Sequence, residues 1–230
     1  KAVLENPNIL SGYTMTLIIL VLGTAINLTL TSLGAFVVTR KKFKPAKVIL
    51  KFMIFTMYFS GGMIPSYLLI NNTLHLGNTI WALVLPGAIS TYNLIIMKTN
   101  FASIPDSLEE SAHIDGANDF IVFWKVVLPL SVSVLMVMVL FYGVAHWNSW
   151  FNAMIYIDDR SKYPLQLILR EILLIGNVND MVIGDGSEKY AIAESIKYAT
   201  IIVATLPILL VYPLIQKYFV KGIMIGAVKG

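Results

Sequence analysis

The sequence contains no cysteine and is short of charged residues. The lack of cysteine excludes disulfide bonds, thiolate metal ligands and a cysteine nucleophile. Charged residues make up only 13% of the chain, about half the share of an ordinary soluble domain, while 57% is apolar. A soluble fold of 230 residues would lack the charged side chains that its surface needs. The composition therefore indicates a membrane protein.

Patterns typical of metal, nucleotide and catalytic sites are also missing. His75, His113 and His146 lie far apart and none has a second ligand at metal spacing, so we predict no metal site. No G-x-x-x-x-G-K-[ST] loop is present, so the chain does not bind ATP by that route. The apolar runs hold no paired carboxylates, His dyad or Ser and Lys pair, which disfavours an intramembrane enzyme. The net charge of +4 arises from Lys and Arg between apolar runs, so no nucleic acid is expected.

Five apolar runs are each long enough to cross about 30 Å of hydrocarbon as a helix, which takes about 20 residues. They cover residues 14–38, 48–70, 79–97, 126–147 and 196–220. All 13 acidic residues fall outside them, as expected because a carboxylate at mid-bilayer costs about 2.5–3.5 kcal/mol. We predict an all-α, polytopic transmembrane helix bundle, one domain over residues 1–230. A further span is expected to precede Lys1.

Proline and polar residues interrupt these runs. Helices are expected to kink at the prolines that interrupt or flank the runs, which are Pro65, Pro86, Pro129, Pro207 and Pro213. Polar side chains at this depth, such as Asn27 and Asn93, either hold helices together or line a translocation path. Both interpretations stay open, with Asn93, Trp147 and Asn148 as the candidates for the path.

The basic residues predict the orientation. Six of them crowd the first connection, whereas residues 71–78 carry no charge; the six are Arg40, Lys41, Lys42, Lys44, Lys47 and Lys51. Positive residues near span ends are retained in the cytoplasm, so the first connection lies inside. Alternation then places residues 100–125 inside and an extracytoplasmic loop, 149–195, outside, with Lys1 outside and Gly230 cytoplasmic.

The inside segment, residues 100–125, is predicted to form two short helices. Ser107 and Glu110 have the spacing of a capping box, which predicts a helix over residues 108–115 that ends at Gly116. A second helix begins at Asn118 or Asp119. It is expected to present Phe120, Phe123, Trp124 and Val127 on one apolar side, and Pro129 is expected to fix its bend into the membrane. A soluble partner could bind this two-helix segment through Glu109, Glu110 and Asp115.

The same segment carries a motif at fixed spacing. Glu110, Ser111 and Ala112 are followed by three residues, Gly116, nine residues and then Val126-Val127-Leu128-Pro129. This pattern resembles the EAA signature of ABC importer permeases, E-A-A, three residues, G, nine residues, I-x-L-P. The chain departs from it by Ser for the first Ala and Val for Ile. The resemblance covers nearly the whole chain and is to the maltose-type carbohydrate permeases, whose fold is that of a type I ABC importer permease.

The resemblance implies a permease subunit that moves an oligosaccharide by alternating access. The implied partners are a second, related permease subunit, two cytoplasmic ATPase subunits that hold ATP and Mg, an extracytoplasmic solute-binding protein and membrane lipid. No cofactor is bound by this chain. ATPase coupling is carried over to Glu109, Glu110, Ser111, Ala112, Asp115, Gly116, Ala117 and Phe120. ATPase contact is also implied for the Gly-rich tail, Gly226, Ala227, Val228, Lys229 and Gly230.

Two outer regions bear on substrate and delivery. The stretch from His146 to Ala153 resembles the sub-branch for complex polysaccharide fragments and uronate oligosaccharides, although a Trp and Tyr belt at the membrane interface explains it equally well. By family analogy the long outer loop faces the binding protein, with contacts expected at Asp158, Asp159, Arg160 and Asp185; a solvated loop without a partner is the alternative. A permease for another small solute, a stand-alone channel and an intramembrane enzyme remain as alternative functions.

Overall fold

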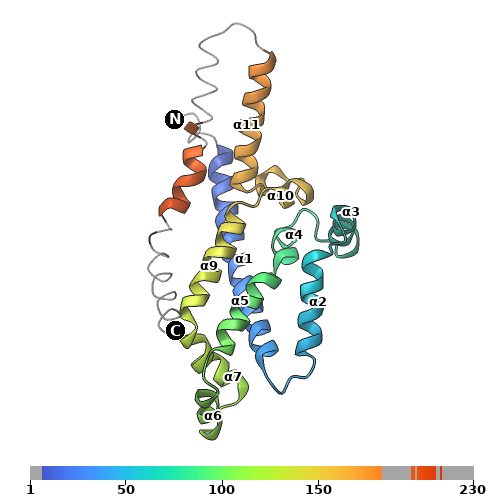
Figure 1. Ribbon diagram of the computed structural model, residues 1–230. Coiled ribbons are helices and arrows are strands. Elements are labelled where there is room, and N and C mark those ends of the chain that lie inside the picture. Colours follow the sequence, from blue (N-terminus) through green and yellow to red (C-terminus); the bar gives the residue numbers. More distant parts are fainter. Residues whose placement is uncertain (1–6, 183–197, 200, 211–212, 214–230) are drawn as a thin grey trace. The chain divides into compact units, whose positions relative to one another are not determined.

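The computed structural model describes residues 7–182, 198–199, 201–210 and 213, and every regular element within these residues is helical (Figure 1). The all-α prediction is therefore confirmed for the part of the chain described. The elements are α1 (Pro7–Thr39), α2 (Ala46–Tyr58), α3 (Met63–Leu68), η1 (Leu69–Thr73), α4 (Trp81–Val84), η2 (Leu85–Gly87), α5 (Thr91–Ala102), α6 (Asp106–Ile114), α7 (Asp119–Val122), η3 (Phe123–Val127), α8 (Leu128–Leu130), α9 (Val132–Trp147), α10 (Phe151–Tyr156), η4 (Arg160–Lys162) and α11 (Leu165–Val182). A further helix covers Ile201–Leu210.

Helix α1 is the one uninterrupted helix of the described chain that is long and apolar enough to cross a membrane. Its 33 residues have a length of about 50 Å. Pro7 stands at its first position, where the missing N–H costs nothing, and no later proline or acidic residue breaks it. Apolar side chains on its outer side, such as Val21, are well exposed, which suits contact with lipid.

Three of the predicted spans are broken helix pairs rather than continuous helices. The run 48–70 is interrupted between Tyr58 and Met63, at Gly61 and Gly62, and Gly62 has a positive φ of 87°. The expected kink at Pro65 is wrong, because Pro65 lies in the first turn of α3, where proline fits a helix. The run 79–97 breaks after η2, which contains Pro86, as expected.

The fourth run bends two residues later than predicted. The helices over Asp119–Leu130 and Val132–Trp147 meet at 82°, and the break lies at Ser131 rather than at Pro129. Pro129 directly follows the π-helical turn Phe123–Val127 and lies near the end of this continuous helix, and the chain turns at the next polar residue, Ser131. Only residues 201–210 of the fifth predicted run, 196–220, form a described helix.

The chain divides into two compact units. Among the described residues, the first combines 7–23, 63–86, 143–182, 198–199, 201–210 and 213, and in it Trp147, Leu165 and Ile168 form a core with Ile9. Thr16 accepts a hydrogen bond from the Leu165 N–H at 2.8 Å, which fixes the start of α11 against α1. The described part of the predicted outer loop 149–195, residues 149–182, is largely helical, because α10, η4 and α11 lie within it.

Among the described residues, the second unit combines 24–62 and 87–142. Its core joins α1, α5, η3 and α9 through residues that include Phe36, Leu94, Met97, Phe123 and Met138. A polar contact crosses this core, because the Thr31 and Tyr142 hydroxyls lie 2.7 Å apart and the Ser90 N–H donates to the Tyr142 oxygen at 3.2 Å.

Asn27 stabilises the break before α5. Its side chain is fully buried, and its Nδ2 donates to the carbonyl oxygens of Gly87 at 2.6 Å and Ala88 at 2.9 Å. These carbonyls are freed because the helix stops, and no water is available to them in hydrocarbon. Asn27 therefore holds two helices together, as the first interpretation of such polar residues predicts.

Replacing Asn27 by Ala is expected to destabilise the protein by about 1–2 kcal/mol, because two carbonyls lose their donor. Unfolding by titration with a denaturing detergent measures this. Thr29→Ala is the matched control, since the Thr29 hydroxyl donates only within its own helix, to Ala25 at 2.8 Å. Equal stability of the two variants would contradict the assignment.

Candidate functional site

Helix α6 lies on the surface and begins earlier than predicted. It starts at Asp106, and its N-cap is Pro105, which makes no side-chain capping bond. The predicted capping box of Ser107 and Glu110 is therefore wrong, because Ser107 already lies within the helix. Asp106 in the first turn places a negative charge at the positive end of the helix dipole, which favours this earlier start.

Gly116 ends α6, as predicted. It has a φ of 87°, which side chains with a Cβ rarely adopt. The Gly116 N–H donates to the His113 carbonyl at 3.0 Å, and the Ala117 N–H donates to the Ala112 carbonyl at 2.9 Å. These two bonds form a Schellman motif, which satisfies the last carbonyls of the helix and reverses the chain. The positive φ therefore explains why the motif has glycine at this position.

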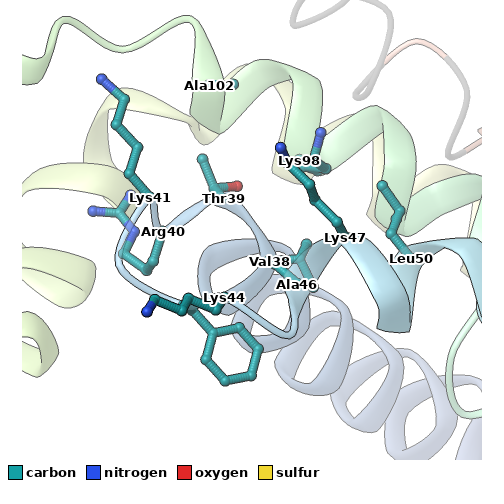
Figure 2. A pocket seen from close by; sticks show the side chains of 11 residues that line it. Val38, Thr39, Arg40, Lys41, Lys44, Ala46, Lys47, Leu50, Lys98 and Ala102 are labelled. Atoms are coloured by element: carbon teal, nitrogen blue, oxygen red, sulfur yellow. The ribbon is translucent and has the colours of Figure 1, made fainter.

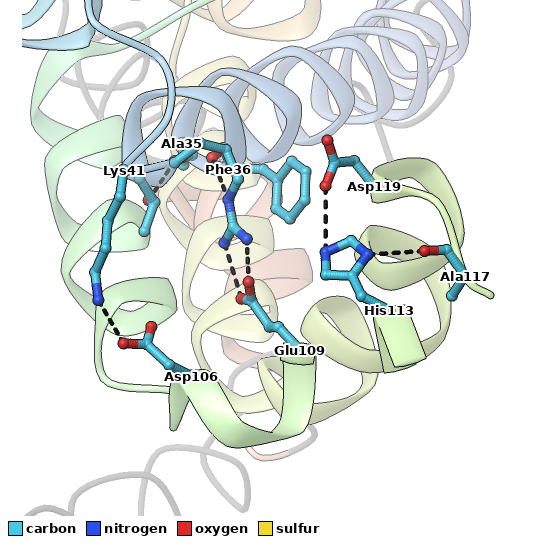
Figure 3. A network of polar contacts seen from close by, with 10 residues as sticks. Ala35, Phe36, Lys41, Asp106, Glu109, His113, Ala117 and Asp119 are labelled. Atoms are coloured by element: carbon cyan, nitrogen blue, oxygen red, sulfur yellow. Dashed lines mark hydrogen bonds and ion pairs between the residues drawn. The ribbon is translucent and has the colours of Figure 1, made fainter. Parts of the chain in front are cut away.

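The turn between α6 and α7 is braced from both sides (Figure 3). Asn118 caps α7 by accepting from the Ile121 N–H at 2.9 Å, which confirms the predicted start of the second helix. His113 bridges the turn, with Nδ1 2.8 Å from the Ala117 carbonyl oxygen and Nε2 3.5 Å from an Asp119 carboxylate oxygen. The sequence did not predict this role of His113, because histidine was considered there only as a metal ligand.

Arg40, at the end of α1, locks α6 in place. Its guanidinium pairs with both carboxylate oxygens of Glu109, with the second contact at 2.9 Å, and its Nε donates to the Phe36 carbonyl at 3.4 Å. The guanidinium carbon also lies 4.1 Å from the centre of the Phe36 ring. The Arg40 and Glu109 side chains are only 20% and 14% exposed. This pair is therefore better shielded from solvent than a typical surface ion pair.

Glu109 thus faces inward, although we expected a soluble partner to bind it. Arg40 was also missed, since its charge was interpreted only as a signal for orientation. Nothing in the linear spacing of Arg40 and Glu109 indicates their contact, which joins positions 69 residues apart. Both residues act by positioning α6.

A second, exposed ion pair lies beside the first. Lys41 donates to the Asp106 carboxylate, and this hydrogen bond raises the pKa of Lys41. Both side chains are mostly exposed, so the contact adds little stability.

The outer surface of α6 and α7 presents a mixture of acidic and apolar side chains. Glu110, Ser111 and Asp115 are exposed, while Ile114 and Phe120 are 86% and 66% exposed. Ala112 and Ala117 are half-buried and pack against the core of the second unit. The structure therefore brings the predicted coupling residues together on two adjoining helices, with Glu109 and the two alanines on the inner side.

The predicted apolar side of the second helix is split. Phe123 and Val127 are buried, whereas Phe120 and Trp124 are exposed. The segment Phe123–Val127 forms a wider, π-helical turn, which shifts the direction of the side chains that follow α7. The expectation that all four share one side is therefore wrong.

The path candidates differ in their surroundings. Trp147 is buried in the core of the first unit, and its Nε1 donates to the Ala204 carbonyl at 3.1 Å. Asn93 is buried just after the start of α5, where its N–H donates to Ser90 Oγ. Asn148 is exposed, and its amide donates to the Val144 carbonyl. Trp147 therefore packs within this chain, and the assignment of these three residues to a translocation path stays a prediction.

The outer candidates form a short polar turn. Asp159 accepts hydrogen bonds from the Ser161 hydroxyl and N–H, and these bonds lower the pKa of Asp159. Arg160 pairs with Glu171 at 2.8 Å, and Asp158 is exposed. Asp185 and the tail from Gly226 to Gly230 lie outside the described residues. Within the described part of the chain, no cluster of His, Asp and Glu side chains could hold a metal ion.

Comparison with known proteins identifies the class. Residues 31–225 match the family described as "Binding-protein-dependent transport system inner membrane component". The chain belongs to this family, and it is the permease subunit of an ATP-driven ABC importer, an inner membrane component rather than an enzyme. The resemblance of the chain to ABC importer permeases is thereby confirmed.

The chain is also similar to individual named proteins and to a solved structure. It is 44% identical to "Protein LplC" of Bacillus subtilis (strain 168), over 100% of this chain and 78% of that protein. It is also 44% identical to the "Polygalacturonan/rhamnogalacturonan transport system permease protein YtcP" of the same organism, over 94% of this chain and 76% of that protein. A crystal structure of a bacterial ABC transporter involved in the import of the acidic polysaccharide alginate contains a chain with a TM-score of 0.85 and 29% identity, covering 95% of this chain and 78% of that one.

Replacing Glu109 by Gln is expected to loosen α6 by about 1–3 kcal/mol, because Arg40 loses the charge that its shielded position requires. Amide hydrogen exchange in residues 106–122 should become several-fold faster. The double variant Arg40→Glu with Glu109→Arg should restore part of the protection. Lys41→Gln, which breaks the exposed pair, is the control and should change little; equal effects of Lys41→Gln and Glu109→Gln would refute the lock.

Proposed function

We propose that this permease imports an acidic oligosaccharide of the uronate class, delivered by an extracytoplasmic solute-binding protein. The observation that carries this proposal is the 44% identity to a permease described as transporting polygalacturonan and rhamnogalacturonan. The likeness to a permease chain of an alginate importer supports the same chemistry. All three named polysaccharides contain acidic sugars.

The proposed coupling surface is the outer side of α6 and α7. Glu110, Ser111 and Asp115 offer polar contacts, and Ile114 and Phe120 offer apolar area, as a protein interface with a polar rim requires. Arg40 holds α6 from the inner side, and the Schellman motif and His113 fix the turn between α6 and α7. A push on this surface by an ATPase would therefore reach α1 through Arg40 without passing through a flexible linker.

The mechanism is alternating access. ATP and Mg are held by two separate cytoplasmic ATPase subunits, and closure of these subunits favours one arrangement of the permease through its contacts with α6 and α7. The permease pair is formed with a second, related subunit. The first connection and α6 face the cytoplasm together with Gly230, and Lys1 lies outside. The tail, Gly226 to Gly230, reaches the ATPases.

The turn around Asp158, Asp159 and Arg160 is proposed to contact the binding protein. Its hydrogen bonds and the pair between Arg160 and Glu171 fix its shape, while Asp158 stays exposed. Asn93, Trp147 and Asn148 remain proposed contacts of the translocation path. A permease for another small solute is the second candidate, since the family as described is not restricted to sugars.

Replacing Gly116 by Val should abolish transport and substrate-stimulated ATPase activity, because a β-branched residue at a φ of 87° costs about 1–3 kcal/mol. No heavy atom lies within 4 Å of a Cβ at this position, so the effect comes from the backbone alone. Gly116→Asn should therefore keep much of the activity, because Asn tolerates this region. Glu110→Lys should uncouple the ATPase while the complex still assembles. Full stimulation in both Gly116→Val and Glu110→Lys would refute the coupling role.

Uptake into vesicles that contain the whole transporter and its binding protein tests the substrate class. Oligogalacturonides should be accumulated on addition of ATP, and unlabelled oligogalacturonides should compete with them. Neutral maltooligosaccharides of the same length serve as the control and should compete at least about tenfold less well, the effect of about 1.4 kcal/mol. Equal competition by the neutral sugars would favour the second candidate function.

A further inference from the structure

A cavity of about 470 Å³ lies between the end of α1, the start of α2 and the end of α5 (Figure 2). All three elements contribute to it from within the second unit. Its apolar wall includes Val38, Leu50 and Ala102. Its charged side chains are all basic and come from the connecting loop and from α2 and α5; they are Arg40, Lys41, Lys44, Lys47 and Lys98. No acidic side chain lines the cavity.

Two of the five cations already have partners. Arg40 pairs with Glu109 and Lys41 pairs with Asp106. Lys44, Lys47 and Lys98 make no ion pair with any residue in the described part of the chain. Three positive charges from three different elements are therefore left to face one cavity.

Such an arrangement favours a bound anion. Like charges that share a site repel one another, and the repulsion grows where apolar walls reduce the local dielectric constant. In Figure 2 the side chains of Lys47, on α2, and Lys98, on α5, extend toward the same part of the cavity. An anion between them would replace repulsion by attraction.

The apolar surroundings indicate which anion fits. Val37, Val48 and Ile49, next to the cavity in the chain, are 41%, 56% and 40% exposed. They belong to two apolar helices, at the end of α1 and at the start of α2. A ligand with a phosphate head and acyl chains would satisfy the lysines and cover these side chains together, whereas free phosphate would satisfy the lysines alone. Basic pockets between transmembrane helices on the cytoplasmic side are typical binding sites for anionic lipid headgroups.

We propose that this cavity binds the phosphate headgroup of an anionic phospholipid, with Lys47 and Lys98 as its ligands and Lys44 adding positive charge from the loop. The assignment to the cytoplasmic leaflet rests on the proposed orientation. Because the same loop carries Arg40 and Lys41, a bound lipid would also fix the residues that hold α6.

The test is lipid binding to the complete transporter complex in detergent. The complex is titrated with phosphatidylglycerol or with phosphatidylcholine, and bound lipids are counted by native mass spectrometry. The unaltered complex should retain phosphatidylglycerol in preference. The variant with Lys44→Gln, Lys47→Gln and Lys98→Gln should bind it about tenfold more weakly, since each cation adds to the attraction. The matched control removes the same charge outside the cavity, with Lys42→Gln, Lys51→Gln and Lys125→Gln, and should bind within twofold of the unaltered complex.

Each other outcome overturns the proposal. Equal loss of lipid in the control variant would show a general charge effect, and equal binding of phosphatidylcholine would show that charge does not matter. Displacement of phosphatidylglycerol by millimolar inorganic phosphate would assign the site to a free anion. If the cavity variant fails to assemble with the ATPases in lipid-free detergent while the control assembles, the lysines contact protein instead. The binding assay in detergent contains no transported substrate and no membrane leaflet. Its result therefore does not depend on whether the proposed function is correct.

Discussion

The structure depends on one constraint, that hydrocarbon offers no hydrogen bonds to a broken backbone. Helix α1 meets it by remaining unbroken over Pro7–Thr39. The other apolar runs are interrupted, and their free backbone groups need partners from elsewhere in the chain. Asn27 supplies such a partner from α1, and Tyr142 accepts the Ser90 N–H at the start of α5. The continuous helix is thus the support on which a broken one is assembled.

The same helix supports the proposed coupling surface on α6 and α7. Arg40 follows α1 directly and holds Glu109 by a bidentate contact that is largely shielded from solvent. A Schellman motif and His113 then fix α7 relative to α6. Because each of these contacts is internal, the outer residues Glu110, Ser111 and Asp115 remain available to a partner. A surface that must transmit force benefits from this division between an inner side that is locked and an outer side that is free.

The basic first connection combines three physical roles that the sequence alone does not separate. Its total charge favours a cytoplasmic location, whichever lysine supplies it. Arg40 and Lys41 are directed toward α6, while Lys44 and Lys47 face a cavity that Lys98 completes. Orientation depends on the number of charges, whereas the contacts depend on where each side chain points.

The sequence by itself determined the class of the protein and the place of its main site. Apolar length, the absence of acids from the runs and the spacing from Glu110 to Pro129 are local properties, and they predicted the all-α fold, the turn at Gly116 and the cap at Asn118. The tertiary structure decided what depends on partners distant in the sequence. It placed Glu109 on Arg40, buried Trp147, moved one bend from Pro129 to Ser131 and divided Phe120 and Trp124 from Phe123 and Val127. Periodicity assumes a regular helix and cannot foresee a π-helical turn, and spacing cannot show which of many lysines or arginines a given carboxylate will meet.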